Sequence, residues 1–125
     1  MPNIVLNQAG SSDISRSNEA NVSVTKLTSI AGADHFCPAP LSEEITKKVQ
    51  DLALSAHRAL DLEVYSRVDI LLSEAGAPLV IEVNTIPGMT PSSLLPEAAA
   101  AVGISYPELC ARIIDLSVAA RAQPA

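Results

Sequence analysis

Two runs rich in Val, Ile and Leu, separated by a short polar turn, constrain this fold more than any other feature of the sequence. The runs span residues 64–72 and 78–84, and the segment between them, 73–77, contains Gly76. Aliphatic, β-branched runs of this length predict strands, and a connection this short favours an antiparallel hairpin. We therefore expect an antiparallel sheet.

Side chains alternate between the two faces of a strand, so each run separates polar from aliphatic positions. One face is expected to carry the polar groups, together with Val80: Arg67, Asp69, Glu82 and Asn84. The opposite face is expected to carry mostly aliphatic side chains: Val68, Ile70, Leu79, Ile81 and Val83. The hairpin is therefore predicted to have one polar and one aliphatic face.

Helices are predicted before and after the hairpin. From Leu41 onward, Ser42 is placed to cap the N-terminus of a helix. Apolar residues then recur at the spacing of one helical face: Ile45, Val49, Leu52, Ala53, Ala56 and Leu60. Pro96 is expected to open a short helix that Gly103 ends, and Ser105 with Glu108 forms a capping box before a final helix. The predicted fold class is α/β (α+β), with helices packed on the aliphatic face of the sheet.

The first 36 residues differ in character from the rest. Small polar residues dominate 10–21, which is typical of a loop, whereas 22–28 and 3–7 have the composition of short strands. We expect three parts: residues 1–36, with one or two strands and otherwise undefined structure; a domain over 37–121; and a tail, 122–125, that frays.

Composition excludes several classes of function. The chain has 125 residues and a net charge of −6, which suits a single domain and disfavours binding to nucleic acids or anionic membranes. No run approaches the roughly 18–20 apolar residues of a membrane span. The N-terminus lacks the pattern of a secretory signal, so we expect a cytoplasmic protein. Because only 2 % of the residues are aromatic, the core must consist of Leu, Ile, Val and Ala.

The polar face of the hairpin is the best candidate for a functional site. Two carboxylates and an amide oxygen are the hard oxygen donors that Mg²⁺ prefers, and Arg67 adds a positive charge for phosphate or carboxylate groups. The alternative is an exposed sheet face with a simple ion pair between Arg67 and one acid. The glycine-containing loop after the second strand favours a site, since its backbone N–H groups can face a developing oxyanion.

Several motifs resemble the C-terminal signature of D-alanine–D-alanine ligases, which belong to the ATP-grasp superfamily. They are Arg67-Val68-Asp69, the run 82–90 and the pair Ser93-Leu94, and the similarity extends from Cys37-Pro38-Ala39 to about residue 120. The resemblance implies the fold of the C-terminal ATP-grasp subdomain. The sequence departs from the family pattern at Val64, where the family usually has glycine.

The resemblance implies a role for each residue of the motifs. Asp69, Glu82 and Asn84 are expected to bind two Mg²⁺ ions that bridge the phosphates of ATP. Arg67 and the backbone N–H of Gly88 are expected to stabilise the tetrahedral intermediate. Ser93 and the Leu94 backbone are expected to hold the carboxylate of the second substrate, which can be D-alanine or D-lactate. The reaction would serve peptidoglycan precursor synthesis by way of an acyl phosphate.

Ligases of this family are longer, with an N-terminal domain and a central domain that grasps ATP from the other side. Neither is recognisable in this sequence, so we predict that the chain does not catalyse alone. Two alternatives follow: a non-enzymatic module that associates with other proteins, such as a homo-oligomer, or one half of a split ligase whose other half is a separate chain.

Overall fold

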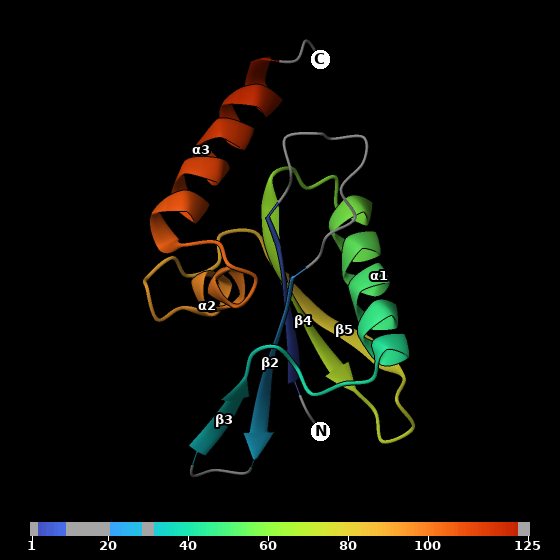
Figure 1. Cartoon of the computed structure of the whole chain (residues 1–125). Helices are drawn as coiled ribbons and strands as arrows, with labels where there is room; N and C mark the ends of the chain where they lie inside the picture. The colour runs from blue at the N-terminus through green and yellow to red at the C-terminus, as the bar shows by residue number, and fades with distance from the viewer. Residues whose placement is uncertain (1–2, 10–20, 29–31, 123–125) are drawn as a thin grey trace.

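A computed structural model describes residues 3–9, 21–28 and 32–122 of the chain, which form one sheet and three helices (Figure 1). In chain order the elements are β1 (Asn3–Ala9), β2 (Asn21–Thr28), β3 (Gly32–Phe36), α1 (Glu43–Ala59), β4 (Tyr65–Leu72), β5 (Pro78–Asn84), α2 (Leu94–Ala101) and α3 (Tyr106–Ala122). The predicted class, an α/β fold with an antiparallel sheet, is confirmed.

The sheet has the strand order β3-β2-β1-β4-β5, and every neighbouring pair is antiparallel. β1 lies in the centre, between β2 and β4, so strand pairing crosses the boundary predicted at residue 37. The limits of the three predicted parts stay a prediction. Most of the predicted loop over 10–21 lies outside the described residues, as does the tail beyond Ala122.

The β4–β5 hairpin turns where the sequence indicated. The N–H of Ser73 donates to the Ala77 carbonyl at 3.0 Å, and Gly76 adopts a positive φ of 79°, which glycine tolerates without strain.

A bulge interrupts the pairing of the two strands after Asp69, so that Ile70 pairs with Val80. The expected position of Val80 on the polar face is therefore wrong: it lies on the face of Ile70, and Leu79 moves to the other face. The predicted alternation holds only from Glu82 to Asn84, because one extra residue in a bulge reverses the faces beyond it.

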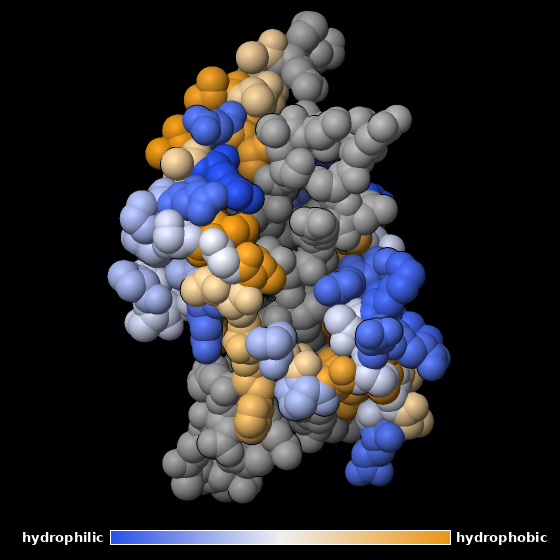
Figure 2. All heavy atoms as spheres, viewed as in Figure 1, coloured by the Kyte–Doolittle hydropathy of each residue, from blue (hydrophilic) through white to orange (hydrophobic). Residues whose placement is uncertain are grey.

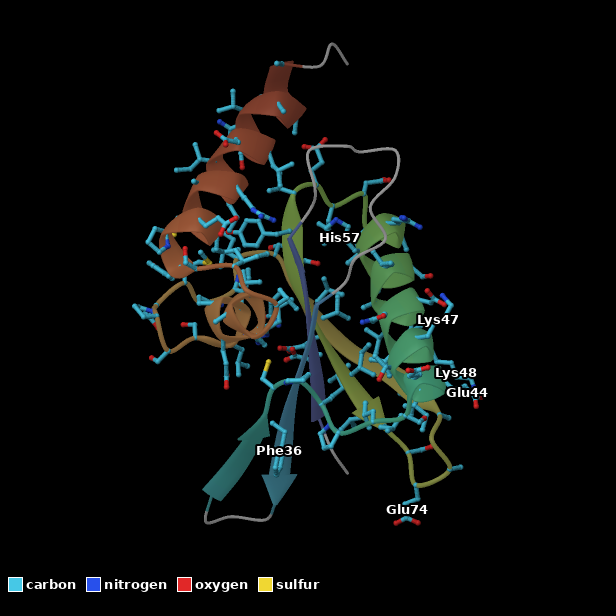
Figure 3. All side chains as sticks on the ribbon, in the orientation of Figure 1. Phe36, Glu44, Lys47, Lys48, His57 and Glu74 are labelled. Carbon is cyan, nitrogen blue, oxygen red and sulfur yellow. The ribbon has the colours of Figure 1, made fainter. Side chains whose placement is uncertain are left out.

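The helix α1 begins where the sequence predicted and packs on the aliphatic face of β4. The N–H of Ile45 donates to the Ser42 hydroxyl at 3.3 Å, which caps the helix. Buried side chains from α1 and β4 form one core cluster: Val49, Ala53, Val68, Ile70 and Leu72. The charged side chains of α1, such as Lys47 and Lys48, point away from the sheet (Figure 3).

The helices α2 and α3 lie on the other side of the sheet (Figure 1). They enclose a second cluster, formed by Leu95, Ala99 and Leu109, against which Tyr65 packs. Tyr65 alternates with Ser66 along β4 and therefore lies on the polar face. The helices were expected on the aliphatic face, but α1 alone packs there, since the polar face also offers Tyr65 as an apolar contact. α2 also begins before Pro96, at Leu94.

Val64, just before β4, has a φ of 65°. This left-handed conformation is unfavourable for a β-branched residue, and it occurs at the position where the resembling family usually has glycine.

Apolar side chains gather on the outer part of α3 in the view of Figure 2, where Ile114 and Val118 are 62 % and 64 % exposed. Among the described residues, no helix combines the length and the apolar character needed to cross a bilayer.

Candidate functional site

The hairpin brings the four predicted polar residues onto one face. In the register of β4 and β5, Arg67 lies opposite Asn84 and Asp69 lies opposite Glu82. Directly opposed residues of an antiparallel pair share a face, with their Cβ atoms about 5 Å apart. The position of these residues before the bulge keeps all four side chains together.

Arg67 is held between the two acids. Its Nε donates to Asp69 Oδ1 at 3.0 Å and its Nη2 donates to Asp69 Oδ2 at 3.3 Å, which is a bidentate pair. The same Nη2 lies 3.8 Å from Glu82 Oε1. Asn84 Nδ2 donates to that Glu82 oxygen at 3.0 Å. The cluster therefore contains one guanidinium for two carboxyl groups.

The two carboxyl groups have pKa values that move in opposite directions. Burial raises the pKa of Asp69, whose residue is only 8 % exposed, and neighbouring Glu82 raises it further, whereas Arg67 lowers it. Hydrogen bonds from Asn84 and Asp69 lower the pKa of Glu82. When the two groups share one proton, it therefore resides on Asp69. Of the two acids, Asp69 is thus the one that keeps its proton to the higher pH.

This donor set fits a divalent cation. Asp69 and Glu82 are close enough to hydrogen-bond each other, so both can reach one ion, and Asn84 adds an amide oxygen. Within the described part of the chain, no group of three or more His, Cys, Asp or Glu side chains could hold a metal. The third donor here is an amide, which is common among the oxygen ligands of Mg²⁺ and Ca²⁺.

A second group of predicted residues meets in the loop between β5 and α2. Ser93 is the residue that precedes the first turn of α2, and its Oγ accepts from the Thr90 N–H at 3.1 Å. The hydroxyl groups of Thr90 and Ser93 lie 2.6 Å apart. A Cβ at Gly88 would lie 3.0 Å from Ser93 Oγ, so a side chain there would displace this hydroxyl. The structure therefore places Gly88 and Ser93 side by side.

Leu94, the other predicted substrate-binding residue, is the first residue of α2. Its backbone N–H is one of the groups at a helix N-terminus that attract anions, such as a carboxylate. The position is consistent with the predicted role, and that role stays a prediction.

Two contacts of this loop were not predicted. Thr90 contacts Ser93 as described above, and the Tyr106 hydroxyl donates to the Met89 carbonyl from α3. No contact of Tyr106 was predicted; it is the first residue of α3, directly after the capping residue Ser105. The only signal in the sequence is that Tyr106 starts the helix that comes after the loop and one short helix. This is a weak signal for a contact with the loop.

A polar pair on the opposite face of β4 is separate from the site. His57 Nδ1 lies 2.7 Å from Ser66 Oγ, and both residues are buried. His57 lies near the end of α1, beside the sheet (Figure 3). Burial lowers the pKa of His57, and the charge of Arg58 lowers it as well, against a backbone hydrogen bond at Leu62. This histidine therefore has a structural role.

Comparison with known proteins places the chain in a family. The family described as "D-ala D-ala ligase C-terminus" matches residues 12–115. The D-alanine–D-alanine ligase of Oleidesulfovibrio alaskensis is 58 % identical over 88 residues, which are 70 % of this chain and 29 % of that protein. The ligase of Nitratidesulfovibrio vulgaris is 54 % identical over 89 residues, or 71 % of this chain and 29 % of that protein.

Solved structures agree with this assignment. The D-alanine–D-alanine ligase of Bacillus anthracis complexed with ATP is 30 % identical, with a TM-score of 0.82, over 96 % of this chain and 39 % of that one. The ligase of Coxiella burnetii is 28 % identical, with a TM-score of 0.78, over 95 % of this chain and 32 % of that one. The chain spans about 29 % of the length of the curated relatives cited above. It belongs to the D-ala D-ala ligase C-terminus family.

Proposed function

We propose that this chain supplies one wall of the active site of a D-alanine–D-alanine ligase, and that it needs a further protein part for catalysis. The observation that carries the proposal is the cluster on the polar face of the hairpin, where two acids and an amide surround a single guanidinium. Family membership supports the same reading. The cytoplasmic location expected from the sequence remains a prediction.

In this proposal, Asp69, Glu82 and Asn84 hold two Mg²⁺ ions. These ions, when bound, offset the negative charge of the ATP phosphates while the carboxylate of the first D-alanine is phosphorylated. Their positive charge also favours ionised Asp69, which is buried and holds its proton more tightly than an exposed aspartate does. The excess negative charge of the cluster thus favours binding of the cations.

Arg67 and Gly88 act on the charge that develops during acyl transfer. The amine of the second D-alanine attacks the acyl phosphate, and the negative charge on the resulting tetrahedral oxygen is stabilised by the Arg67 guanidinium and the Gly88 N–H. Arg67 is fixed for this role by its bidentate pair with Asp69. Ser93 and the Leu94 N–H bind the carboxylate of the second substrate, which anchors its amine for attack.

Complementation tests this function. This chain would be mixed with the front part of the Oleidesulfovibrio alaskensis ligase, truncated before the region that matches. With D-alanine, ATP and Mg²⁺, we expect ADP release from the mixture and from neither part alone. D-lactate as the second substrate, compared in the same assay, identifies which of the two is used. Turnover by this chain alone would show that our claim of dependence is wrong.

Variants of the cluster provide the matched comparison. We expect Asp69→Asn and Glu82→Gln to reduce turnover of the mixture at least 100-fold, because each removes a charged ligand of the cations. Glu74→Gln is the control, since Glu74 lies at the exposed tip of the hairpin (Figure 3) and should leave turnover unchanged. Equal loss in all three variants would contradict the proposed metal site.

Association without catalysis is a second candidate. It is favoured by the exposed apolar side chains of α3, Ile114 and Val118, and of β5, Leu79 and Ile81. Light scattering of the chain, combined with titration of ATP and Mg²⁺, separates the two candidates. An oligomer that does not bind nucleotide, and that fails in the complementation assay, would favour this second function.

A further inference from the structure

The loop between β5 and α2, residues 85–93, carries two groups to which the proposed function gives separate tasks: the Gly88 N–H and the Ser93 hydroxyl. The loop has no regular secondary structure of its own beyond turns and bends. The distance between the Gly88 N–H and the Ser93 hydroxyl therefore depends on the individual hydrogen bonds and side-chain contacts of this loop.

One contact comes from α3. The Tyr106 hydroxyl donates a hydrogen bond to the carbonyl of Met89, which is the residue directly after Gly88. The Met89 side chain packs on the cluster of Leu95, Ala99 and Leu109 that joins α2 to α3. Met89 is thus fixed at both its backbone and its side chain, and both anchors lie outside the loop.

Another set of contacts connects Met89 to Ser93. The next residue, Thr90, donates its N–H to Ser93 Oγ at 3.1 Å and accepts at its carbonyl from the Ser93 N–H at 2.9 Å. Gly88 lies against the same Ser93 hydroxyl, since a Cβ at Gly88 would lie only 3.0 Å from its oxygen. Met89 therefore stands between Gly88 and Thr90, the two residues that touch Ser93, and a shift of its carbonyl would move both.

We propose that Tyr106 is a positioning residue for this loop: its hydroxyl fixes the Met89 carbonyl and thereby sets the distance between the Gly88 N–H and the Ser93 hydroxyl. The substrate that this arrangement serves is an amino or hydroxy acid whose carboxylate binds at Ser93. This step rests on the proposed function. The hydrogen bond of Tyr106 acts on the loop that carries these two groups, so its effect falls on the second substrate and on the Gly88 N–H, and not on ATP.

The first test measures the stability of the loop's hydrogen bonds in the absence of any ligand. Tyr106→Phe removes the hydroxyl and keeps the ring, and Tyr65→Phe is the matched control because Tyr65 packs on the same cluster. Amide-proton exchange by NMR reports the N–H groups of Thr90 and Ser93. We expect exchange at both to be at least tenfold faster in Tyr106→Phe and unchanged in Tyr65→Phe. The N–H groups of Ile104 and Leu109, which donate to Ala99 and Ser105, should keep their rates.

Exchange at Thr90 and Ser93 that stays at the wild-type rate in Tyr106→Phe would overturn the inference. Faster exchange at Ile104 and Leu109 as well would also overturn it, since the variant would then loosen the whole α2–α3 unit. Thr90→Val is the second variant: it keeps the N–H but removes the hydroxyl that meets Ser93, and it should accelerate exchange at Ser93 without affecting Leu109.

The second test uses the complemented enzyme and separates this inference from the proposed function. We expect Tyr106→Phe to raise the KM for the second substrate about tenfold and to leave the KM for ATP unchanged. Equal changes in both KM values would contradict a role restricted to the loop that binds the second substrate. A mixture that never turns over, together with the expected exchange rates, would refute the proposed function and leave the tether by Tyr106 intact.

Discussion

Ser66 and Arg67 are neighbours on β4, yet they belong to polar groups of opposite kinds on opposite faces of the sheet. On the α1 face, Ser66 is fully buried and its hydroxyl meets the His57 ring at 2.7 Å, so that two neutral groups satisfy each other. On the other face, Arg67 meets Asp69 and Glu82, and the three groups leave one negative charge without a partner when both acids are ionised.

The difference indicates which polar group is structural and which is functional. A buried polar group with a protein partner contributes to stability and needs nothing else. A cluster with excess charge, in which the pKa of one acid is raised by burial, is stabilised further by a proton on that acid or by a ligand that supplies the missing charge. The proposed cation site is thus the less stable of the two arrangements in the absence of ligand.

The largest expected effect comes from breaking the satisfied pair. Ser66→Ala removes the hydroxyl and leaves His57 Nδ1 buried without this partner. We expect the free energy of unfolding to fall by about 1–3 kcal/mol, the cost of leaving a buried polar group unpaired. Urea denaturation measures this change. A loss below about 0.5 kcal/mol would show that the two faces differ less than we infer.

Which side chains of β4 lie on each face also depends on where the strand begins, and it begins directly after Val64, whose backbone is left-handed. Val64→Gly relieves a φ of 65° that a β-branched residue adopts at a cost of about 1–3 kcal/mol. Glycine also increases the entropy of the unfolded chain, so we expect a net gain of about 1 kcal/mol in the free energy of unfolding. Thermal and urea denaturation test the gain. A loss of stability would mean that the left-handed turn is not the source of strain.

Much of this comparison could be predicted from the sequence, because it depends on alternation within short strands. The hairpin, the capping of α1 by Ser42, and the common face of Asp69 and Glu82 follow from local patterns of two to four residues. The bulge after Asp69 could not be predicted, since nothing in a run of aliphatic residues marks the position of an extra one. The exchange of faces by Leu79 and Val80 therefore appeared only in the structure.

Contacts between distant parts of the chain were also beyond the sequence. The hydroxyl of Tyr106 meets the Met89 carbonyl across 17 positions, and the site of contact depends on how α2 and α3 pack. The pairing of His57 with Ser66 could not be identified from the sequence either, since a serine on an aliphatic face can be satisfied in many ways. Such pairings depend on tertiary packing, and spacing alone does not define them.

The two faces should respond to pH in opposite directions, and the His57 side gives the larger response. Because burial lowers the pKa of His57 below 6.5, the unfolded chain takes up a proton at a higher pH than the folded chain does. The contribution of His57 to stability is therefore full above about pH 7 and is lost as the pH falls through 6.5 and below. Unfolding by urea between pH 7.5 and 5 should show wild type losing stability relative to His57→Gln. A constant difference would mean that the ring is solvated.

Asp69 should give the smaller and opposite response, since Arg67 offsets part of the effect of burial on its pKa. With the folded pKa above 3.8, the contribution of this group is full below that pH and is lost as the pH rises through the raised value. Wild type should therefore lose stability relative to Asp69→Asn between pH 4 and 7 when no divalent cation is added.

Adding Mg²⁺ makes the prediction for Asp69 sharper, because a bound cation favours the ionised carboxylate. The wild type should then become more stable than Asp69→Asn. With ATP and millimolar Mg²⁺ at pH 7, we expect wild type to gain stability and Asp69→Asn to gain none, as measured by urea denaturation. The same additions should leave the difference between wild type and His57→Gln unchanged, since that pair lies on the opposite face of β4. If the cation shifted both differences equally, it would act on the protein as a whole, and the excess charge around Arg67 would have no specific ligand.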